Sequence, residues 1–416
     1  MDYLQRTGVF IFSLSIISLF WVELTPVVLS ISIILLAALA ITNIIVTRII
    51  VFYNQIILAF IFFLFLLLSV LFSSNPLYGF ERILIKLPIL VLVIAAGSIQ
   101  LSNYYIRLIR CIFISIIYFI SIVMLFNYFL NYEAINKLYE MGQVMPTPIH
   151  HIRYSILVLL AIHFLLLDIP ISLFQLRLFS FLRLAGLLFL VVFIHVLGVR
   201  TSLVAFYVLL MFHFFVYLKA IRFKSYGLFI GMGILLVLAG ILIITPSVRM
   251  KINDTQKDIL IYTTNSYSNH ASISKRIISY EAAISIWKEN KILGCGIGDI
   301  KDDTDLFFRG RKNDVDVPIL PHNQFLFFLA ATGLIGLFLF VLLFYYPLLS
   351  KEFINNISFK GYTIIISLAF MTEPMLETQL GVAIVMIFYS LELIETRENS
   401  KTLKEFVFKK NLARIN

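Results

Sequence analysis

The chain has 416 residues, of which 61% are hydrophobic and only 13% are charged, well below the charged share of about 25% in soluble domains. Apolar runs of about 20 residues exclude a transmembrane β-barrel, whose alternating strands are about ten residues long. The net charge of +10 is therefore attributed to the loops of a membrane protein rather than to nucleic acid binding. The composition predicts an all-α polytopic membrane protein.

Nine apolar runs long enough to span a bilayer precede a long polar segment. We place these predicted spans near residues 8–22, 26–46, 50–72, 83–100, 106–129, 152–168, 179–197, 199–217 and 226–245. The first run lacks the cleavage pattern of a signal peptide and is expected to remain as a span. The seventh and eighth runs form one block that is too long for a single helix, so we predict a break at Gly198 with Arg200 opening the eighth span.

The polar segment, residues 246–321, is predicted to be the one large water-facing loop. An amphipathic helix is expected over Ser274–Lys291, because apolar residues recur there at helical spacing (Ile277, Tyr280, Ile284 and Trp287). The glycine-rich stretch Leu293–Asp299 follows a helix rather than a strand, so we interpret it as a helix stop and turn and not as a nucleotide-binding loop.

A tenth span is predicted near residues 322–346, and a last apolar block covers residues 361–394. Glu373, Pro374 and Glu377 lie in the middle of that block. Proline interrupts helical hydrogen bonding and carboxylates are costly in lipid, so two short spans meeting at this point are expected in place of one. The predicted total is about 12 spans, with the large loop between spans 9 and 10.

The distribution of Lys and Arg predicts the orientation. With the amino terminus inside, the inner segments hold 17 of the 33 Lys and Arg residues, the short outer connectors hold 5 and the long loop holds 11. The expected organisation is spans 1–9 over residues 1–245, an outer loop over 246–321, spans 10–12 over 322–395 and a basic inner tail over 396–416. The tail is expected to be disordered or, alternatively, to lie on anionic lipid.

Three polar residues fall on the predicted outer side. Arg200 opens the eighth span, Arg276 lies on the amphipathic helix and His322 opens the tenth span. Histidine can act as a general base at working pH, and two guanidinium groups match the oxygens of a phosphate-bearing ligand. The alternatives remain open: His322 as an interface or capping residue beside Asn323, and Arg276 as a solvated surface residue.

Other polar stretches are weaker candidates. His151 and Arg153 lie at the outer mouth of the sixth span and Ser73–Lys86 precedes the fourth, where each either lines a cavity or anchors a helix end. Glu377 is expected to hold an arginine or to orient a sugar hydroxyl. Acidic residues late in the loop are interpreted as solvated rather than as a site for a metal-bound sugar nucleotide (Asp302, Asp303, Asp305, Asp314 and Asp316).

Three stretches of the chain resemble the O-antigen ligase and polymerase family of bacterial inner-membrane proteins: Leu197–Phe206, Lys275–Asp299 and Pro321–Leu337. In that family an arginine before small hydroxyl residues opens a span, an Arg-to-Trp helix leads to a Gly-x-Gly turn, and a His-Asn pair opens the span after a large periplasmic loop. A looser likeness covers His150–Ser155 and Glu373–Val382.

The resemblance implies transfer of a glycan from undecaprenyl diphosphate to a sugar hydroxyl of an acceptor glycolipid such as lipid A-core. His322 would be the base and Arg200 and Arg276 would bind the diphosphate, with four further residues in substrate orientation (His151, Arg153, Asn323 and Glu377). Neither a metal nor another cofactor is expected, and nucleic acid is not an expected partner. The protein would lie in the bacterial inner membrane, in contact with membrane lipid, with both termini cytoplasmic.

The acceptor is left open by this resemblance. A ligase is ranked first, and a polymerase that extends the same repeat with the same donor is the alternative; protein O-glycosylating enzymes share the motifs. A transporter of lipid-linked sugars and a membrane scaffold are readings from other classes. Most charge lies near the ends of the spans, which favours an enzyme with a surface site over a transporter.

Overall fold

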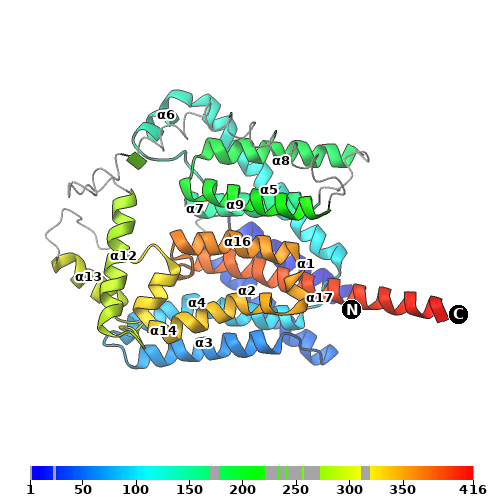
Figure 1. Cartoon of the computed structure of the whole chain (residues 1–416), viewed down its shortest axis with the longest axis horizontal. Helices are drawn as coiled ribbons and strands as arrows, with labels where there is room; N and C mark the ends of the chain where they lie inside the picture. The colour runs from blue at the N-terminus through cyan, green and yellow to red at the C-terminus, as the bar shows by residue number, and fades with distance from the viewer. Residues whose placement is uncertain are drawn as a thin grey trace.

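The computed structural model describes residues 2–21, 25–168, 178–220, 272–310 and 319–415, together with the isolated positions 233, 240, 255 and 256. Every regular element in these residues is a helix (Figure 1). The bounds are α1 (Asp2–Ser18), α2 (Thr25–Thr47), α3 (Tyr53–Leu71), α4 (Pro76–Ser98), α5 (Asn103–Leu130), α6 (Tyr132–Glu140), α7 (His151–Leu167), α8 (Leu178–Leu197), α9 (Arg200–Ala220), α12 (Ser272–Glu289), α13 (Ile300–Gly310), α14 (Gln324–Tyr345), η1 (Tyr346–Leu349), α15 (Lys351–Ile354), α16 (Ile357–Thr372), η2 (Met375–Glu377) and α17 (Gln379–Ile415).

Every predicted span except the ninth overlaps one of these helices. By length and composition, 6 of the described helices can cross a membrane, and they lie in α2, α3, α5, α9, α14 and α17. The helices α7, α8 and α16 contain shorter apolar stretches. The ninth predicted span, residues 226–245, and most of the loop before Ser272 lie outside the described residues, so the total of 12 spans stays a prediction.

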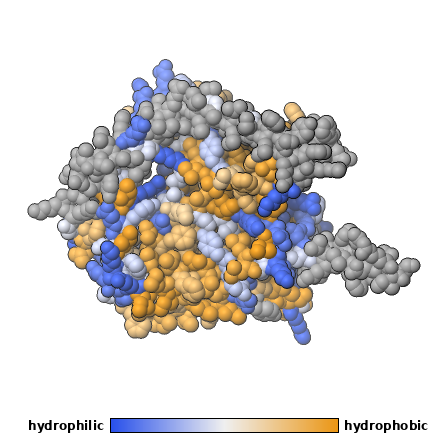
Figure 2. Space-filling model, in the orientation of Figure 1, coloured by the Kyte–Doolittle hydropathy of each residue, from blue (hydrophilic) through white to orange (hydrophobic). Residues whose placement is uncertain are grey.

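The long helices form one bundle and run nearly along a common direction (Figure 1). Both ends of the chain lie at one end of the bundle, whereas α12 and α13 lie at the other (Figure 1). Figure 2 shows a largely hydrophobic surface over the middle of the bundle, with hydrophilic residues toward its ends. In the apolar part of α17, 83% of the residues are buried, against 28% in α3, so α17 is an inner helix and α3 has an outward-facing apolar surface.

Both predicted helix breaks are confirmed. The helix α8 ends at Leu197, Gly198 adopts a φ of 65°, and α9 begins at Arg200. The helix α16 ends at Thr372, and the short helix η2 separates it from α17. The helix α17 continues to Ile415, so the basic tail is helical where disorder was the favoured expectation.

The glycine-rich turn is built into a kink in α14. Gly333 has a φ of 63° and interrupts the helical hydrogen bonds. The carbonyl groups of Ala330 and Ala331 instead accept the backbone N–H groups of Cys295 and Gly296, at 3.0 and 2.9 Å. In return, the N–H groups beyond the kink donate to the turn (Leu334 to Lys291 at 3.0 Å, Ile335 to Ile292 at 3.3 Å). This exchange fixes the polar segment that carries α12 to α14, the helix that follows His322.

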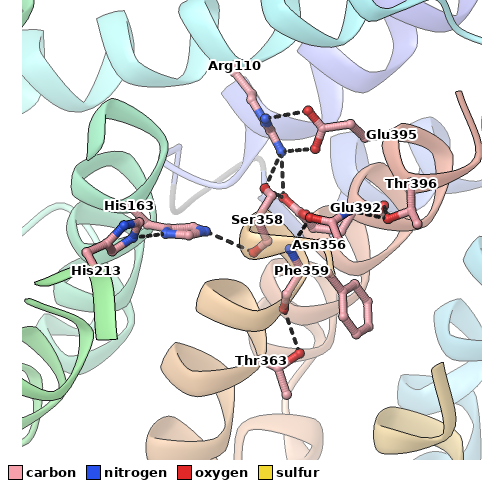
Figure 3. Close-up of polar contacts among 10 residues, drawn as sticks. All are labelled: Arg110, His163, His213, Asn356, Ser358, Phe359, Thr363, Glu392, Glu395 and Thr396. Carbon is pink, nitrogen blue, oxygen red and sulfur yellow. Dashed lines mark hydrogen bonds and ion pairs between the residues drawn. The ribbon is translucent and has the colours of Figure 1, made fainter. Parts of the chain in front are cut away.

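A buried polar cluster joins α5, α16 and α17 near the amino-terminal end of α16 (Figure 3). We call it the Arg110 cluster (Arg110, Ser358, Glu392 and Glu395). The Arg110 guanidinium lies 2.7 Å from Glu392 and 2.6 Å from Glu395. Beside it, the His163 ring contacts His213 and the carbonyl group of Ser358, both at 2.9 Å (Figure 3). These contacts satisfy polar groups that would otherwise be costly inside a membrane bundle.

Candidate active site

His322 precedes Asn323, the residue that caps the start of α14. The Asn323 side chain accepts the N–H groups of Phe325 and Leu326, at 2.9 and 3.1 Å. An Asn in this position satisfies donors that the first turn leaves without partners. His322 therefore projects from a rigid helix terminus rather than from a free loop.

A single carboxylate joins His322 to Arg276. Oε1 of Glu373 lies 3.4 Å from Nδ1 of His322 and 3.6 Å from a terminal nitrogen of Arg276. The three side chains come from three elements: the start of α14, the helix α12 and the connection between α16 and α17. Two of the three residues that sequence reasoning selected for chemistry are thus brought together.

Backbone contacts hold these three elements in place. The Ser279 hydroxyl accepts the N–H group of His322 at 3.2 Å. The Tyr280 hydroxyl lies 3.2 Å from the carbonyl oxygens of both His322 and Met371, and Asn323 donates to Met371 at 3.1 Å. Burial raises the pKa of Tyr280, so its hydroxyl keeps its proton and remains a donor.

Glu373 is ionised in spite of its burial. Its side chain is 10% exposed, and burial alone would raise the pKa of this carboxyl because it penalises the charged form. The contact with His322 and the positive charges of His322, Arg276 and His150 outweigh that effect, so the pKa of Glu373 lies below its ordinary value of 4.5. A negative charge thus faces the His322 ring and the Arg276 guanidinium near neutral pH.

The remaining outer candidates line the same end of the bundle. Thr201 and Ser202, which follow Arg200, share a narrow cavity with Thr372, the residue before Glu373. Ile152 lines the same cavity, which places the start of α7 beside the start of α9. Nε of Arg153 is buried without a hydrogen-bond partner, and Arg153 interacts electrostatically with Glu373. The rings of His150 and His151 lie 4.4 Å apart.

With this geometry established, the chain can be compared with known proteins. The family model described as O-antigen ligase matches residues 185–341. The matched residues are similar to that family, and we refer to them as the O-antigen ligase domain after it. It indicates a membrane glycosyltransferase of the ligase or polymerase type, and it confirms the resemblance that the motifs predicted. A comparison with curated proteins finds no match.

The O-antigen ligase domain contains Arg200, Arg276 and His322, whereas Arg153 and Glu373 lie outside the matched residues. The site is thus assembled from the domain together with the flanking helices α7 and α16. The carboxylate that links the base to the arginine is supplied by the connection after α16, which only the three-dimensional structure brings to the domain.

Glu377 occupies a different position from the one expected of it. Among the described residues, a lysine rather than an arginine contacts its carboxylate: Nζ of Lys86 lies 2.7 Å from Oε2, and Gln324 donates to Oε1 at 3.2 Å. Arg82 contacts Glu377 only through the backbone carbonyl group, at 3.2 Å. The side chain of Glu377 is 3% exposed, so it lies behind the surface of the site.

Two weaker candidates turn out to anchor one another. The Asp299 carboxylate accepts the N–H groups of Ser74 and Asn75, at 2.9 and 2.8 Å, and Asn75 donates to Asp302 at 3.1 Å. The stretch before α4 is therefore a helix anchor, and Asp299 is its partner. Asp314 and Asp316 lie outside the described residues.

Sequence reasoning missed Glu373 as a site residue, although it used this residue to place a helix break. The available signal was an ionisable group beside proline inside an apolar block, which is rare in membrane segments without a functional reason. Tyr280 was counted only as part of an apolar helix face. Its hydroxyl contacts depend on elements 42 and 91 residues away along the chain, so no local pattern predicts them.

Proposed function

We propose that the O-antigen ligase domain transfers a glycan from undecaprenyl diphosphate to a sugar hydroxyl of lipid A-core, at the end of the bundle that carries α12. The observation that supports this most directly is the carboxylate of Glu373, 3.4 Å from His322 and 3.6 Å from Arg276. A proton acceptor and a phosphate-binding cation thus lie on either side of one buried charge. Glycosyl transfer from a diphosphate needs both.

His322 is the general base in this proposal. Its Nδ1 faces Glu373, so Nε2 takes the proton from the acceptor hydroxyl while that oxygen bonds to the anomeric carbon of the donor sugar. Glu373 orients the ring and balances the charge of the imidazolium that forms. A positioned base of this kind contributes about 10² to 10⁴ in rate.

Arg276 and Arg200 bind the diphosphate of the donor. As the bond between the anomeric carbon and the phosphate oxygen breaks, the electron pair leaves with undecaprenyl diphosphate, and guanidinium groups stabilise that negative charge. The Arg276 side chain is 20% exposed and its contact with Glu373 is long, at 3.6 Å. Arg276 can therefore shift toward a phosphate when the donor binds. This charge stabilisation is proposed to take the place of a metal.

The setting of the reaction is the bacterial inner membrane. The lipid-facing helices leave room for the polyprenyl chain in the bilayer, so that only the diphosphate and the glycan need to reach the site. The site end of the bundle would face the periplasm and both termini the cytoplasm. His151, Arg153 and Asn323 are proposed to orient substrate, with Glu377 acting indirectly through the connection that carries Glu373.

The test is a transfer assay in proteoliposomes that contain undecaprenyl-diphosphate-linked glycan and either lipid A-core or a second donor molecule. We expect glycan on lipid A-core with the wild-type protein and loss of this product with His322→Ala and Arg276→Gln. The matched control is Arg309→Gln, which changes an exposed arginine of α13 and is expected to retain transfer.

Two outcomes would revise the proposal. Elongated donor in place of modified lipid A-core would identify a polymerase that uses the same residues. Absence of any product while labelled donor crosses the bilayer would overturn the enzyme and favour a transporter.

A further inference from the structure

Three buried polar side chains, which we call the Lys86 triad (Lys86, Gln324 and Glu377), meet directly behind the site. Nζ of Lys86 lies 2.7 Å from Oε2 of Glu377, and the Gln324 amide donates to Oε1 at 3.2 Å. Lys86 and Gln324 are completely buried, and Glu377 is 4% exposed. The triad joins α4, α14 and η2, and its members cannot touch a substrate.

The triad holds one side of the connection that carries Glu373. Oε1 of Gln324 accepts the N–H group of Leu376 at 2.7 Å, and Arg82 donates to the carbonyl group of Glu377 at 3.2 Å. On the other side, Asn323 donates to the carbonyl group of Met371 at 3.1 Å. Glu373 thus lies between two sets of hydrogen bonds, each of which includes a residue at the start of α14.

Stability alone does not account for a lysine at this position. The free energy needed to desolvate a lysine and a carboxylate is about as large as the electrostatic attraction they gain when buried as a pair. Well-packed apolar residues would therefore hold the helices together equally well. Apolar residues would not fix the direction of the Gln324 amide. The Lys86 charge orients the Glu377 carboxylate, which orients Gln324, and Gln324 binds the backbone three residues beyond Glu373.

We propose that Lys86 is a positioning residue that acts through Glu377 and Gln324 to hold Glu373 against His322 and Arg276. This inference rests on the proposed function, because it concerns the geometry of that same site. Displacing a group of the site by about 1 Å can reduce the rate about 10²-fold. Lys86 therefore contributes to catalysis without contacting any substrate.

The test is the double variant Lys86→Met, Glu377→Gln in the proteoliposome assay. It removes both buried charges and keeps an amide that can bond to Gln324. We expect kcat to fall roughly 10- to 100-fold, while KM for the donor changes by less than about twofold because ground-state binding is retained. Added to Glu373→Gln, the same two changes should cause no further loss, since the triad acts through that carboxylate.

The control is Glu395→Gln, which breaks a largely buried ion pair of the Arg110 cluster (side chains 13% and 14% exposed) at the opposite end of the bundle and should leave kcat unchanged. If the double variant does not yield a monodisperse protein, Arg82→Gln tests the same connection from a partly exposed side chain, and the same pattern with a smaller loss is expected. The role of Lys86 would be overturned by a wild-type kcat in these variants. It would also be overturned if the double change reduced kcat as much in the Glu373→Gln protein as in the wild type. A wild-type protein that transfers glycan to no acceptor would overturn the proposed function, and this inference with it.

Discussion

Oε1 of Glu373 is shared by His322 and Arg276, so one atom links proton transfer to diphosphate binding in the proposed reaction. A diphosphate that draws Arg276 toward itself leaves more of the negative charge of Glu373 to His322. That charge favours the imidazolium formed when the acceptor loses its proton. Donor binding, which brings in the leaving group, would therefore also make His322 a stronger base.

The ionised Glu373 predicts a pH dependence of stability. Its pKa is lower in the folded protein than the ordinary value of 4.5, so its contribution is fully present above that value and is lost as the pH falls through the folded pKa. Glu373→Gln should lower the thermal midpoint in detergent near neutral pH, and the difference from the wild type should shrink below about pH 4.5. A difference that stays constant over this range would contradict the charged contact.

The residues of the site differ in how far the sequence predicts them. His322, Arg276 and Arg200 follow from motif order and from the side of the membrane, because each opens or lies on a recognisable helix. Glu373 and Lys86 belong to apolar segments, and their roles depend on contacts between α4, α14 and the α16–α17 connection. Composition and periodicity carry no information about which inner polar residue faces which neighbour.

At the scale of elements, the kink in α14 connects the polar segment to the bundle. The positions of Gly294 and Gly333 need positive φ values of 73° and 63°, which residues with a side chain rarely adopt. A Cβ atom on Gly333 would collide with the carbonyl group of Ile292, and one on Gly294 would meet the backbone of Ala331 at 2.5 Å. The sequence predicted the turn, but not that a second helix is interrupted to receive it.

Gly333→Ala is therefore expected to destabilise the protein. The strained φ alone costs about 1–3 kcal/mol, and the collision adds to it, so the thermal midpoint in detergent should fall and transfer activity should fall with it. Gly310→Ala is the matched control, because nothing lies within 4 Å of the added atom. An unchanged midpoint for Gly333→Ala would show that the kink is not required.

At the scale of the whole molecule, two polar clusters lie at the two ends of α16: the site after Thr372 and the Arg110 cluster around Ser358 (Figure 3). Apolar helix packing between them carries no charge that would fix the register of one helix against another. Polar contacts at both ends can fix it: the Arg110 cluster aligns α5, α16 and α17, and Glu373 aligns the α16–α17 connection with α12 and the start of α14.

Arg110→Met tests the cluster as a structural element. It leaves the carboxylates of Glu392 and Glu395 without their cation, and removing one partner of a buried pair typically costs about 3–5 kcal/mol. The expected result is a large fall in the thermal midpoint. Arg107→Met on the same helix changes an exposed side chain and should shift stability by no more than about 0.5 kcal/mol.

The orientation of the molecule is a separate prediction. Both chain ends lie at the end of the bundle opposite α12 and α13 (Figure 1), and the positive-inside rule assigns the chain ends to the cytoplasm. In a variant without the native Cys111 and Cys295, Gly310→Cys should react with a membrane-impermeant thiol reagent applied from outside the inner membrane. Asn416→Cys should react only after the membrane is opened. The reverse labelling pattern would place the site on the cytoplasmic side.

The length of the apolar runs was sufficient to predict the long apolar helices, because length and hydropathy decide what can cross a bilayer. The short polar helices α6 and α13 were not predicted. The sequence also predicted the breaks at Gly198 and before Glu377, because glycine allows a turn and proline interrupts the hydrogen bonds of the helix that contains it. The sequence did not predict which helices pack against one another. The inner position of α17 and the outer position of α3 depend on contacts among elements of similar composition.

The exchange of hydrogen bonds between the turn and α14 also constrains how the protein is made. The turn, residues 291–296, leaves the ribosome before α14, yet the N–H groups of Cys295 and Gly296 have their acceptors at Ala330 and Ala331. Neither half of α14 has a full set of backbone partners until the exported segment has docked onto it. We therefore expect the polar segment to dock onto α14 before the last spans are complete, in an order set by these four hydrogen bonds.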